Sequence, residues 1–143
     1  MAVINNILAL DVGSVRIGVA VSSLTAKIPR PITTLSNSPE IFNEIRDLIK
    51  TEDVQVIVVG LPRGLDGQIT DQTKQTENFV QKLKSNVEIP IYTQDEALTS
   101  HKAKEELESR GKPYVKEDVD ALAATYILED FLQENVQKLE REL

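Results

Sequence analysis

The stretch ILALDVGSVRIGVAVSS, residues 7–23, places one carboxylate between two apolar runs. The apolar residues before Asp11 and those from 17 to 21 are typical of buried strands, and Gly13 and Ser14 supply a turn between them. The pattern therefore predicts a β-hairpin. Because an unpaired buried charge costs several kcal/mol, we expect Asp11 either to bond to the turn or to hold a ligand.

The rest of the chain alternates between helical and strand patterns. Ser38-Pro39-Glu40 has the residues of a helix start, and the run VQVIVV at residues 54–59 is typical of a strand covered on both faces. A later helix is expected to end at Gly111. The expected strands span residues 3–11, 16–22, 30–35, 54–59 and 88–94, and the expected helices begin at Pro39 and span residues 71–84, 100–110 and 119–139.

This order of elements predicts an α/β fold. Right-handed crossovers require the strands near residues 8, 57 and 91 to lie parallel. The hairpin strands then complete a mixed sheet, for which we expect five strands in the order 3-2-1-4-5 and helices on both faces. With 143 residues and no internal repeat or linker, the sequence is expected to form a single domain over residues 1–143.

The composition narrows the chemistry. The chain has no cysteine, which excludes disulfides and thiolate catalysis. No apolar run is long enough for a membrane span, and we expect a cytoplasmic protein. A net charge of −7 argues against a generic nucleic-acid binder. Residues 118–143 carry −5 of this charge (seven acids and two bases), which leaves −2 for residues 1–117.

Acidic residues follow two of the parallel strands, and another begins the last helix. Asp11 ends the first strand, Asp95 and Glu96 end the last one, and Asp120 lies in the first turn of the terminal helix. Ligand sites of open α/β sheets form at this carboxyl edge, so three acids are expected to converge there. Asp95 and Glu96 alternate faces, so at most one of them points into the site. Asp118 competes with Asp120 as the helix cap.

Carboxylates without nearby thiolates suit Mg²⁺ or Mn²⁺. Two such ions, roughly 3.5–4 Å apart, can stabilise both the attacking and the leaving oxygen of a phosphodiester. The sequence therefore predicts a site for two divalent ions and a nuclease reaction. Each acid also has a simpler structural alternative. Asp11 can accept hydrogen bonds from backbone N–H groups of its turn, and Asp120 can stabilise the positive end of the helix dipole.

Four blocks carry a resemblance to a known family. They are DVGSVRIGVAVSS at residues 11–23, VVGLPRGLDG at 58–67, DEALTS at 95–100 and VDALAATYILEDFL at 119–132. In this order they resemble the YqgF/RuvX family over nearly the whole chain. This family is ribonuclease H-like, and its members are described as nucleases for the 5′ end of pre-16S ribosomal RNA and as Holliday junction resolvase-like.

The resemblance implies a ribonuclease H-like fold and catalytic, metal-binding acids at Asp11, Glu96 and Asp120. It thereby selects one acid from each competing pair. The arginine that usually follows the glutamate in this family is replaced by Ala97. This departure leaves the metal site unchanged and removes one candidate phosphate contact.

Two arginines and a threonine are candidate contacts to nucleic acid. Arg16 lies in the hairpin beside the Asp11 turn, where the family motif also has a base, and Arg63 follows the central strand at the same edge. Thr99 is the expected cap of the next helix and a weaker candidate. The simpler alternatives are solvated charges for both arginines and a purely structural cap for Thr99. His101 is expected to be an exposed helix residue rather than a general base.

The leading interpretation is a metal-dependent nuclease that acts on structured RNA, recognised through shape and backbone because only 4% of residues are aromatic. Cleavage of branched DNA uses the same chemistry but needs a homodimer, because a junction is cut on paired strands. We therefore expect a monomer or a homodimer.

Nucleotide-binding ATPases have a loop similar to DVGSVRIG but bind nucleotide between two such domains. A non-catalytic ribosome-assembly factor, whose acids hold structural ions, is the remaining alternative.

Overall fold

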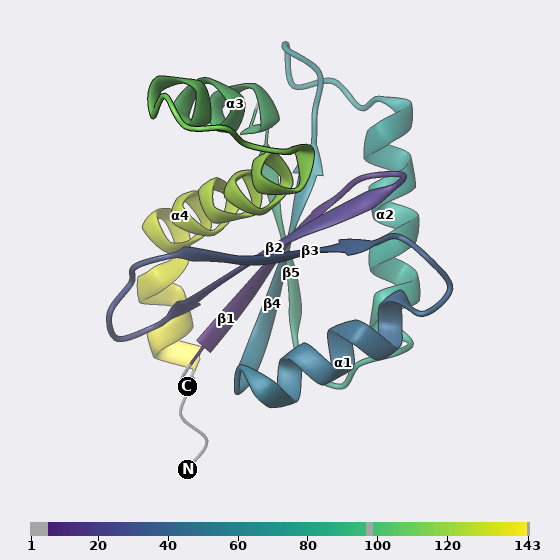
Figure 1. Ribbon diagram of the computed structural model, residues 1–143. Coiled ribbons are helices and arrows are strands. Elements are labelled where there is room, and N and C mark those ends of the chain that lie inside the picture. The colour runs from purple at the N-terminus through teal and green to yellow at the C-terminus, as the bar shows by residue number, and fades with distance from the viewer. Residues whose placement is uncertain (1–5, 97–98, 143) are drawn as a thin grey trace.

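The computed structural model describes residues 6–96 and 99–142, which form one five-stranded sheet between helices (Figure 1). Within these residues, no helix combines the length and the apolarity needed to cross a membrane. The strands are β1 (Asn6–Val12), β2 (Arg16–Ser23), β3 (Arg30–Ser36), β4 (Val54–Pro62) and β5 (Ile91–Glu96). The helices are α1 (Ile41–Thr51), α2 (Asp71–Lys84), α3 (Thr99–Ser109) and α4 (Lys116–Glu142).

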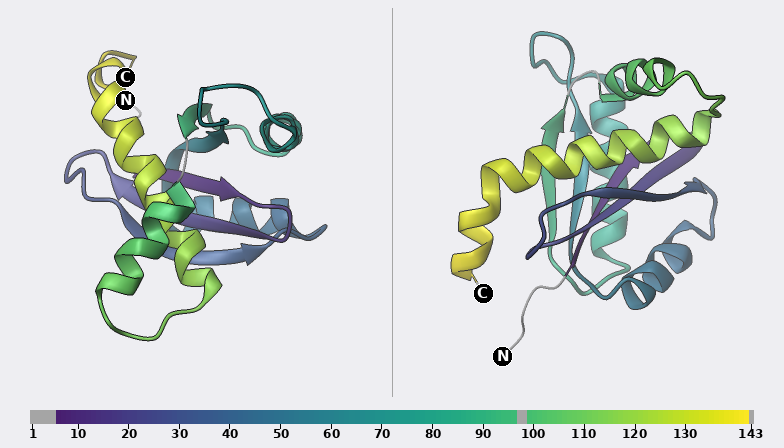
Figure 2. Two further views of the ribbon diagram at one scale, coloured as in Figure 1. Left: turned by 90° about the horizontal axis from the view of Figure 1, so that it is seen from above. Right: turned by 60° about the vertical axis from the view of Figure 1, so that its left-hand side comes forward.

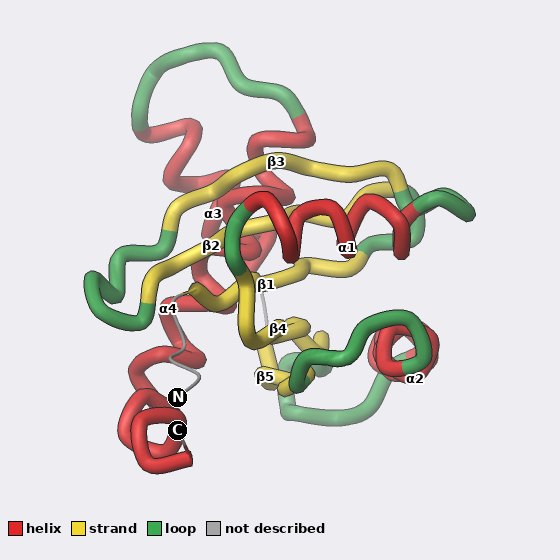
Figure 3. Tube along the Cα trace, turned by 90° about the horizontal axis from the view of Figure 1, so that it is seen from below, coloured by secondary structure: helices red, strands yellow, loops and turns green. Residues whose placement is uncertain are grey.

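The strand order β3-β2-β1-β4-β5 confirms the predicted 3-2-1-4-5 sheet. β1 pairs antiparallel with β2, and β2 with β3, whereas β1, β4 and β5 run parallel. Figure 3 shows β2 and β3 extending the sheet on one side of β1, and β4 and β5 on the other. The carboxyl ends of the three parallel strands therefore lie at one edge. Asp11, Arg63 and Glu96 lie at or directly after these strand ends.

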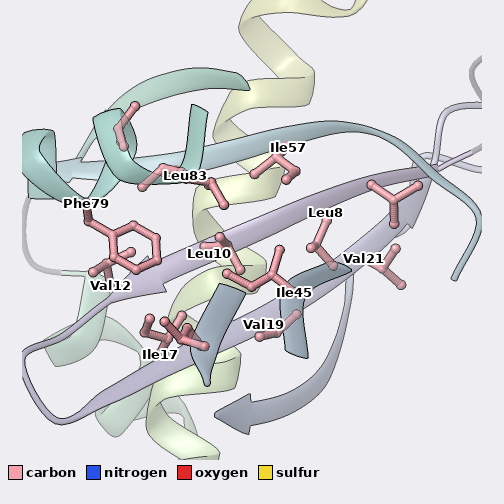
Figure 4. Close-up of a cluster of buried hydrophobic side chains, with 14 residues drawn as sticks. Leu8, Leu10, Val12, Ile17, Val19, Val21, Ile45, Ile57, Phe79 and Leu83 are labelled. Carbon is pink, nitrogen blue, oxygen red and sulfur yellow. The ribbon is translucent and has the colours of Figure 1, made fainter. Parts of the chain in front are cut away.

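Alternate residues of the strands face two separate cores. Leu8 and Leu10 of β1 pack with α1 and α2 on one face of the sheet (Figure 4), whereas Ile7 and Ala9 pack with α4 on the other. Burying each large apolar side chain contributes about 1.5–3 kcal/mol, so both helical layers are held firmly. Asp11 follows Ala9 by two residues, which places its side chain on the α4 face.

Helix α4 crosses its face of the sheet from β2 toward β5 (Figure 2). Its backbone lies directly on Gly18 of β2, where a Cβ atom would stand 1.9 Å from the Asp120 carbonyl oxygen. Farther along, a Cβ on Gly60 of β4 would stand 2.3 Å from Ile127 Cδ1. Closer to the end of α4, the ring of Phe131 lies against that of Tyr92 of β5. Two glycines thus set how closely the helix approaches the sheet.

Helix α1 begins at Ile41 rather than at Pro39, because Ser38 closes a turn first. The Ser38 carbonyl accepts a hydrogen bond from Ile41 N at 3.1 Å, and Ser38 Oγ accepts one from Glu40 N at 3.3 Å. The serine therefore caps a turn that leads into the helix. Residues 3–5, the expected start of the first strand, lie outside the described residues.

The other long elements also shift by a few residues. Helix α4 begins at Lys116, three residues earlier than expected, because Asp118 Oδ2 accepts a hydrogen bond from Val115 N at 3.0 Å. Strand β5 begins at Ile91 rather than at residue 88; the preceding Pro90 lacks an N–H, although its carbonyl accepts from Ile57 N at 3.0 Å. Asp118 therefore stabilises the helix start, which leaves Asp120 facing the sheet.

We predict that Gly18→Ala lowers the free energy of unfolding by about 3 kcal/mol, because the added methyl meets helix backbone that cannot move alone. Gly60→Ala is the matched control: its methyl meets the end of the Ile127 side chain, which can rotate, and the expected loss is about 1 kcal/mol. Urea unfolding of the three proteins measures both. Equal losses would contradict a backbone contact at Gly18.

Candidate active site

Asp11 lies near the end of β1, directly opposite Gly18 of β2. Its side chain is partly exposed on the face that α4 covers. Burial raises the pKa of Asp11 to about 6, and the negative charge of Asp120 adds to this shift. A carboxylate that is costly to ionise and lies next to a second carboxylate is a position that a cation would stabilise.

Asp120 reaches this site because the first turns of α4 rest on Gly18. Its Oδ2 atom accepts a hydrogen bond from Nε of Arg16 at 2.5 Å, across 104 residues of sequence. Arg16 is the first residue of β2. Its side chain is 31% exposed, and that of Asp120 is 18% exposed. The guanidinium thus balances the charge of Asp120, while Asp11 has no such compensation from it.

Glu96 ends β5, and its surroundings are different. Burial, a hydrogen bond with Asp130, and the charges of Asp130 and Glu134 raise the pKa of Glu96 to about 9, against a smaller lowering by Lys102. Its Oε1 atom is buried without a hydrogen-bond partner. The neutral form of the Glu96 carboxyl is therefore favoured near pH 7.

The structure brings two of the three predicted acids together and leaves the third apart. Asp120 and Asp130 lie ten residues apart on one helix, which corresponds to about 15 Å of helix rise. Asp11 interacts with the first of these and Glu96 with the second. No group of three His, Asp or Glu side chains able to hold a metal ion occurs among the described residues.

Sequence reasoning did not single out Asp130 and Glu134. The available signal was their spacing of four residues on a predicted helix, which places both on one face. Glu134 Oε2 accepts a hydrogen bond from Gln94 Nε2 at 2.9 Å, so this part of α4 is bound to β5. Asp130 therefore bonds to the Glu96 carboxyl, and Glu134 adds a second negative charge near it.

The candidate nucleic-acid contacts are placed as follows. Arg63 lies directly after β4 at the carboxyl edge. Its side-chain Nε atom is 3.3 Å from Asp95 Oδ1, and its backbone N–H donates to the Glu96 carbonyl at 2.9 Å. The side chain of Thr99 and the whole of Ala97 lie outside the described residues. His101 is exposed and lies 2.9 Å from Glu105 on the same helix, as expected of a surface residue.

The pair Asp11 and Asp120 fits the ligand preferences of a divalent cation. Mg²⁺ is commonly held by one or two carboxylates, with water and substrate phosphate completing its shell. Burial disfavours the charged form of Asp11, and a bound cation would reverse that preference. The residues in place therefore fit one ion. A second ion that used Glu96 would require its carboxyl to separate from Asp130.

Comparison with solved structures defines the class of fold. The chain is similar to RuvC from Thermus thermophilus, both alone (TM-score 0.54, 16% identity) and in complex with a Holliday junction substrate (TM-score 0.53, 17% identity). Each match covers 90% of this chain and 95% of the other. With the strand order, this likeness confirms the ribonuclease H-like fold.

Sequence comparison then identifies the family. The RuvX family, described as Holliday junction resolvase, matches residues 5–134, and the chain belongs to this family. A relative from Sulfurihydrogenibium sp. (strain YO3AOP1) is 38% identical over 90% of each chain, and one from Crocosphaera subtropica is 40% identical over 89% of this chain and 92% of its own. A third, from Pseudomonas fluorescens (strain SBW25), is 37% identical over 94% and 96%. All three are named "Putative pre-16S rRNA nuclease".

We predict that Asp11→Asn stabilises the metal-free protein at pH 7 by about 1–2 kcal/mol, a figure reduced for the partial exposure of Asp11. The raised pKa means that the native state binds more protons than the unfolded state between about pH 4 and 6. The stability of the wild type therefore falls as pH rises through this window, and the variant lacks that fall.

Urea unfolding in EDTA between pH 4 and pH 8 measures this difference. The two profiles should converge near pH 4 and separate above pH 6. Asp66→Asn, which removes an exposed acid from the loop after β4, is the control and should follow the wild type. Parallel profiles for Asp11→Asn and the wild type would contradict a buried, destabilised carboxylate.

Proposed function

We propose that the protein is a metal-dependent endonuclease that hydrolyses phosphodiester bonds in structured RNA, with the 5′ end of pre-16S ribosomal RNA as its substrate. The observation that carries the proposal is the Asp11–Asp120 carboxylate pair, with Arg16 beside it, at the carboxyl edge of the sheet. Membership of the RuvX family and the names of its relatives support the substrate. Such a reaction would take place in the cytoplasm.

In this proposal each residue at the edge has a distinct role. Asp11 and Asp120 would hold the first Mg²⁺ or Mn²⁺ ion, and Glu96 would contribute to a second after separating from Asp130. Such ions supply an activated water and stabilise the departing 3′ oxygen. Arg16 would exchange Asp120 for a substrate phosphate, so that its guanidinium orients the strand.

The chain's own charges support recognition of backbone and shape. Arg16 and Arg63 both lie at the carboxyl edge, and each is held by a carboxylate, Asp120 and Asp95, respectively. Asp95 is largely exposed, and exposed pairs contribute about 0–1 kcal/mol, so a substrate phosphate can displace Asp95 from Arg63 at little cost. The overall charge of −7 would in turn disfavour binding away from this edge.

Cleavage of branched DNA is the second candidate function. The description of the RuvX family as Holliday junction resolvase and the fold shared with RuvC favour it. It would require two copies of the chain, because a junction must be cut on paired strands. The substrate and the oligomeric state therefore separate the two functions.

We predict that Asp11→Asn slows cleavage of a precursor RNA carrying the 5′ extension of 16S RNA by at least about a hundredfold in Mg²⁺ or Mn²⁺, because the ion loses its desolvated ligand. Asp95→Asn is the matched control: this acid lies at the same edge but is 66% exposed and should be dispensable. A four-way DNA junction is tested in parallel.

The outcomes separate the candidate functions. Cleavage of the RNA by the wild type but not by Asp11→Asn supports the proposal, and cleavage of only the junction by a dimer supports the resolvase. Equal cleavage by the wild type and Asp11→Asn would reject metal-assisted chemistry at this site. If the protein cuts neither substrate but binds precursor ribosomal particles, it is a ribosome-assembly factor.

We also predict that Glu96→Gln reduces cleavage at least about tenfold while changing the unfolding free energy at pH 7 by less than about 0.5 kcal/mol. The neutral carboxyl is already favoured in the free protein, and an amide replaces it with similar shape. Cleavage assays and urea unfolding test both parts. Full activity of Glu96→Gln would limit Glu96 to packing against Asp130.

A further inference from the structure

A groove of about 580 Å³ lies on the other face of the β1–β2 hairpin from the Asp11 site. Its walls are the hairpin turn after β1, the loop between β3 and α1, and the exposed side of α2. Val12 and Gly13, which directly follow Asp11, both line it. The groove therefore begins where the candidate active site ends, across one strand end.

The lining of this groove differs from the rest of the surface. The chain carries 23 acids in 143 residues, yet the described residues that line the groove include neither Asp nor Glu. Its polar side chains are instead four amides, three hydroxyls and one cation. The polar side chains that matter for binding are those of Asn37, Gln72, Gln75, Asn78 and Lys82.

The groove is preformed rather than loosely assembled. Asn37 Nδ2 donates to the Gly13 carbonyl at 2.8 Å, and Asn37 N donates to the Val15 carbonyl at 2.8 Å, so the two loops that form one wall are tied together. Phe42 and Phe79 also line the groove, and their stacked rings lie 5.4 Å apart. In Figure 4 the ring of Phe79 lies beside Val12.

We propose that this groove binds an unpaired nucleotide of the substrate strand, next to the bond that is cut. Amide groups both donate and accept hydrogen bonds, as base edges require, and Lys82 supplies a cation for a phosphate. The partly exposed ring of Phe42 offers an apolar surface for a base. An acid-free groove in an acidic protein is suited to a polyanion, and its continuity with Asp11 fits a strand that crosses the hairpin turn. The inference rests on the proposed function.

The experiment measures binding of a short fluorescent single-stranded RNA in EDTA, so that no cleavage intervenes. Two variants alter the groove: Lys82→Gln removes its cation, and Gln75→Glu adds a negative charge. Lys84→Gln and Gln81→Glu make the same changes at exposed positions of α2 outside the groove. All four replace exposed helix residues with good helix formers, so thermal unfolding should be unchanged.

We expect each groove variant to weaken binding roughly tenfold and each control to bind like the wild type. Lys82→Gln should also lower the slope of log affinity against log salt by about 0.7, the value for one phosphate contact on a single strand. Equal binding by all five proteins would overturn the inference. So would a dimer, found by sedimentation velocity, that Gln75→Glu dissociates, because the groove would then bind a second copy.

Failure of this inference is distinguishable from failure of the proposed function. If Asp11→Asn abolishes cleavage while the groove variants bind RNA normally, the nuclease proposal stands and the groove is not a nucleotide site. If the groove variants lose binding and the wild type cuts no RNA, the groove binds nucleic acid in a protein that is not a nuclease.

Discussion

The contact between α4 and Gly18 of β2 is the constraint on which the site depends. Any side chain at this position would meet the helix backbone at Asp120, since even a Cβ would lie 1.9 Å from its carbonyl oxygen. Glycine thus lets the helix start rest on the sheet beside Asp11, its partner in the β1–β2 ladder. The close approach at Gly18 thus brings together two interacting carboxylates that are 109 positions apart in the chain.

The same helix separates the third acid from the first two. Since α4 continues from β2 toward β5, the acids it presents at its far end meet Glu96 and not Asp11. Without a cation, two of the three acids are compensated locally: Asp120 by Arg16, and Glu96 by its neutral form beside Asp130. These arrangements lower the desolvation free energy of keeping several carboxylates partly buried. In the proposed mechanism, binding of the ions would therefore be coupled to the release of Arg16 and of Asp130 from their partners.

The fold could be predicted from the sequence because the signals that specify it are local or general. Apolar periodicity indicated the strands, and the handedness of crossovers fixed their order, as the run at residues 54–59 illustrates. Boundaries moved where side chains such as Ser38 and Asp118 bonded to nearby backbone. The partner of Glu96 could not be predicted in this way. It depends on the position of α4 along the sheet, which two glycines and a bulky Ile127 decide together.

The groove beside the hairpin turn gives a physical reason for the charge distribution of the chain. A protein with a net charge of −7 repels nucleic acid at most of its surface, and such repulsion favours the few places where cations and amides replace acids. Arg16 directly follows the β1–β2 turn, and Gly13 and Ser14 of the same turn line the acid-free groove. A strand bound along this path would cross the Asp11 carboxylate between them. Acidity elsewhere would then favour this one route for a polyanion to the acids that we propose hold a cation.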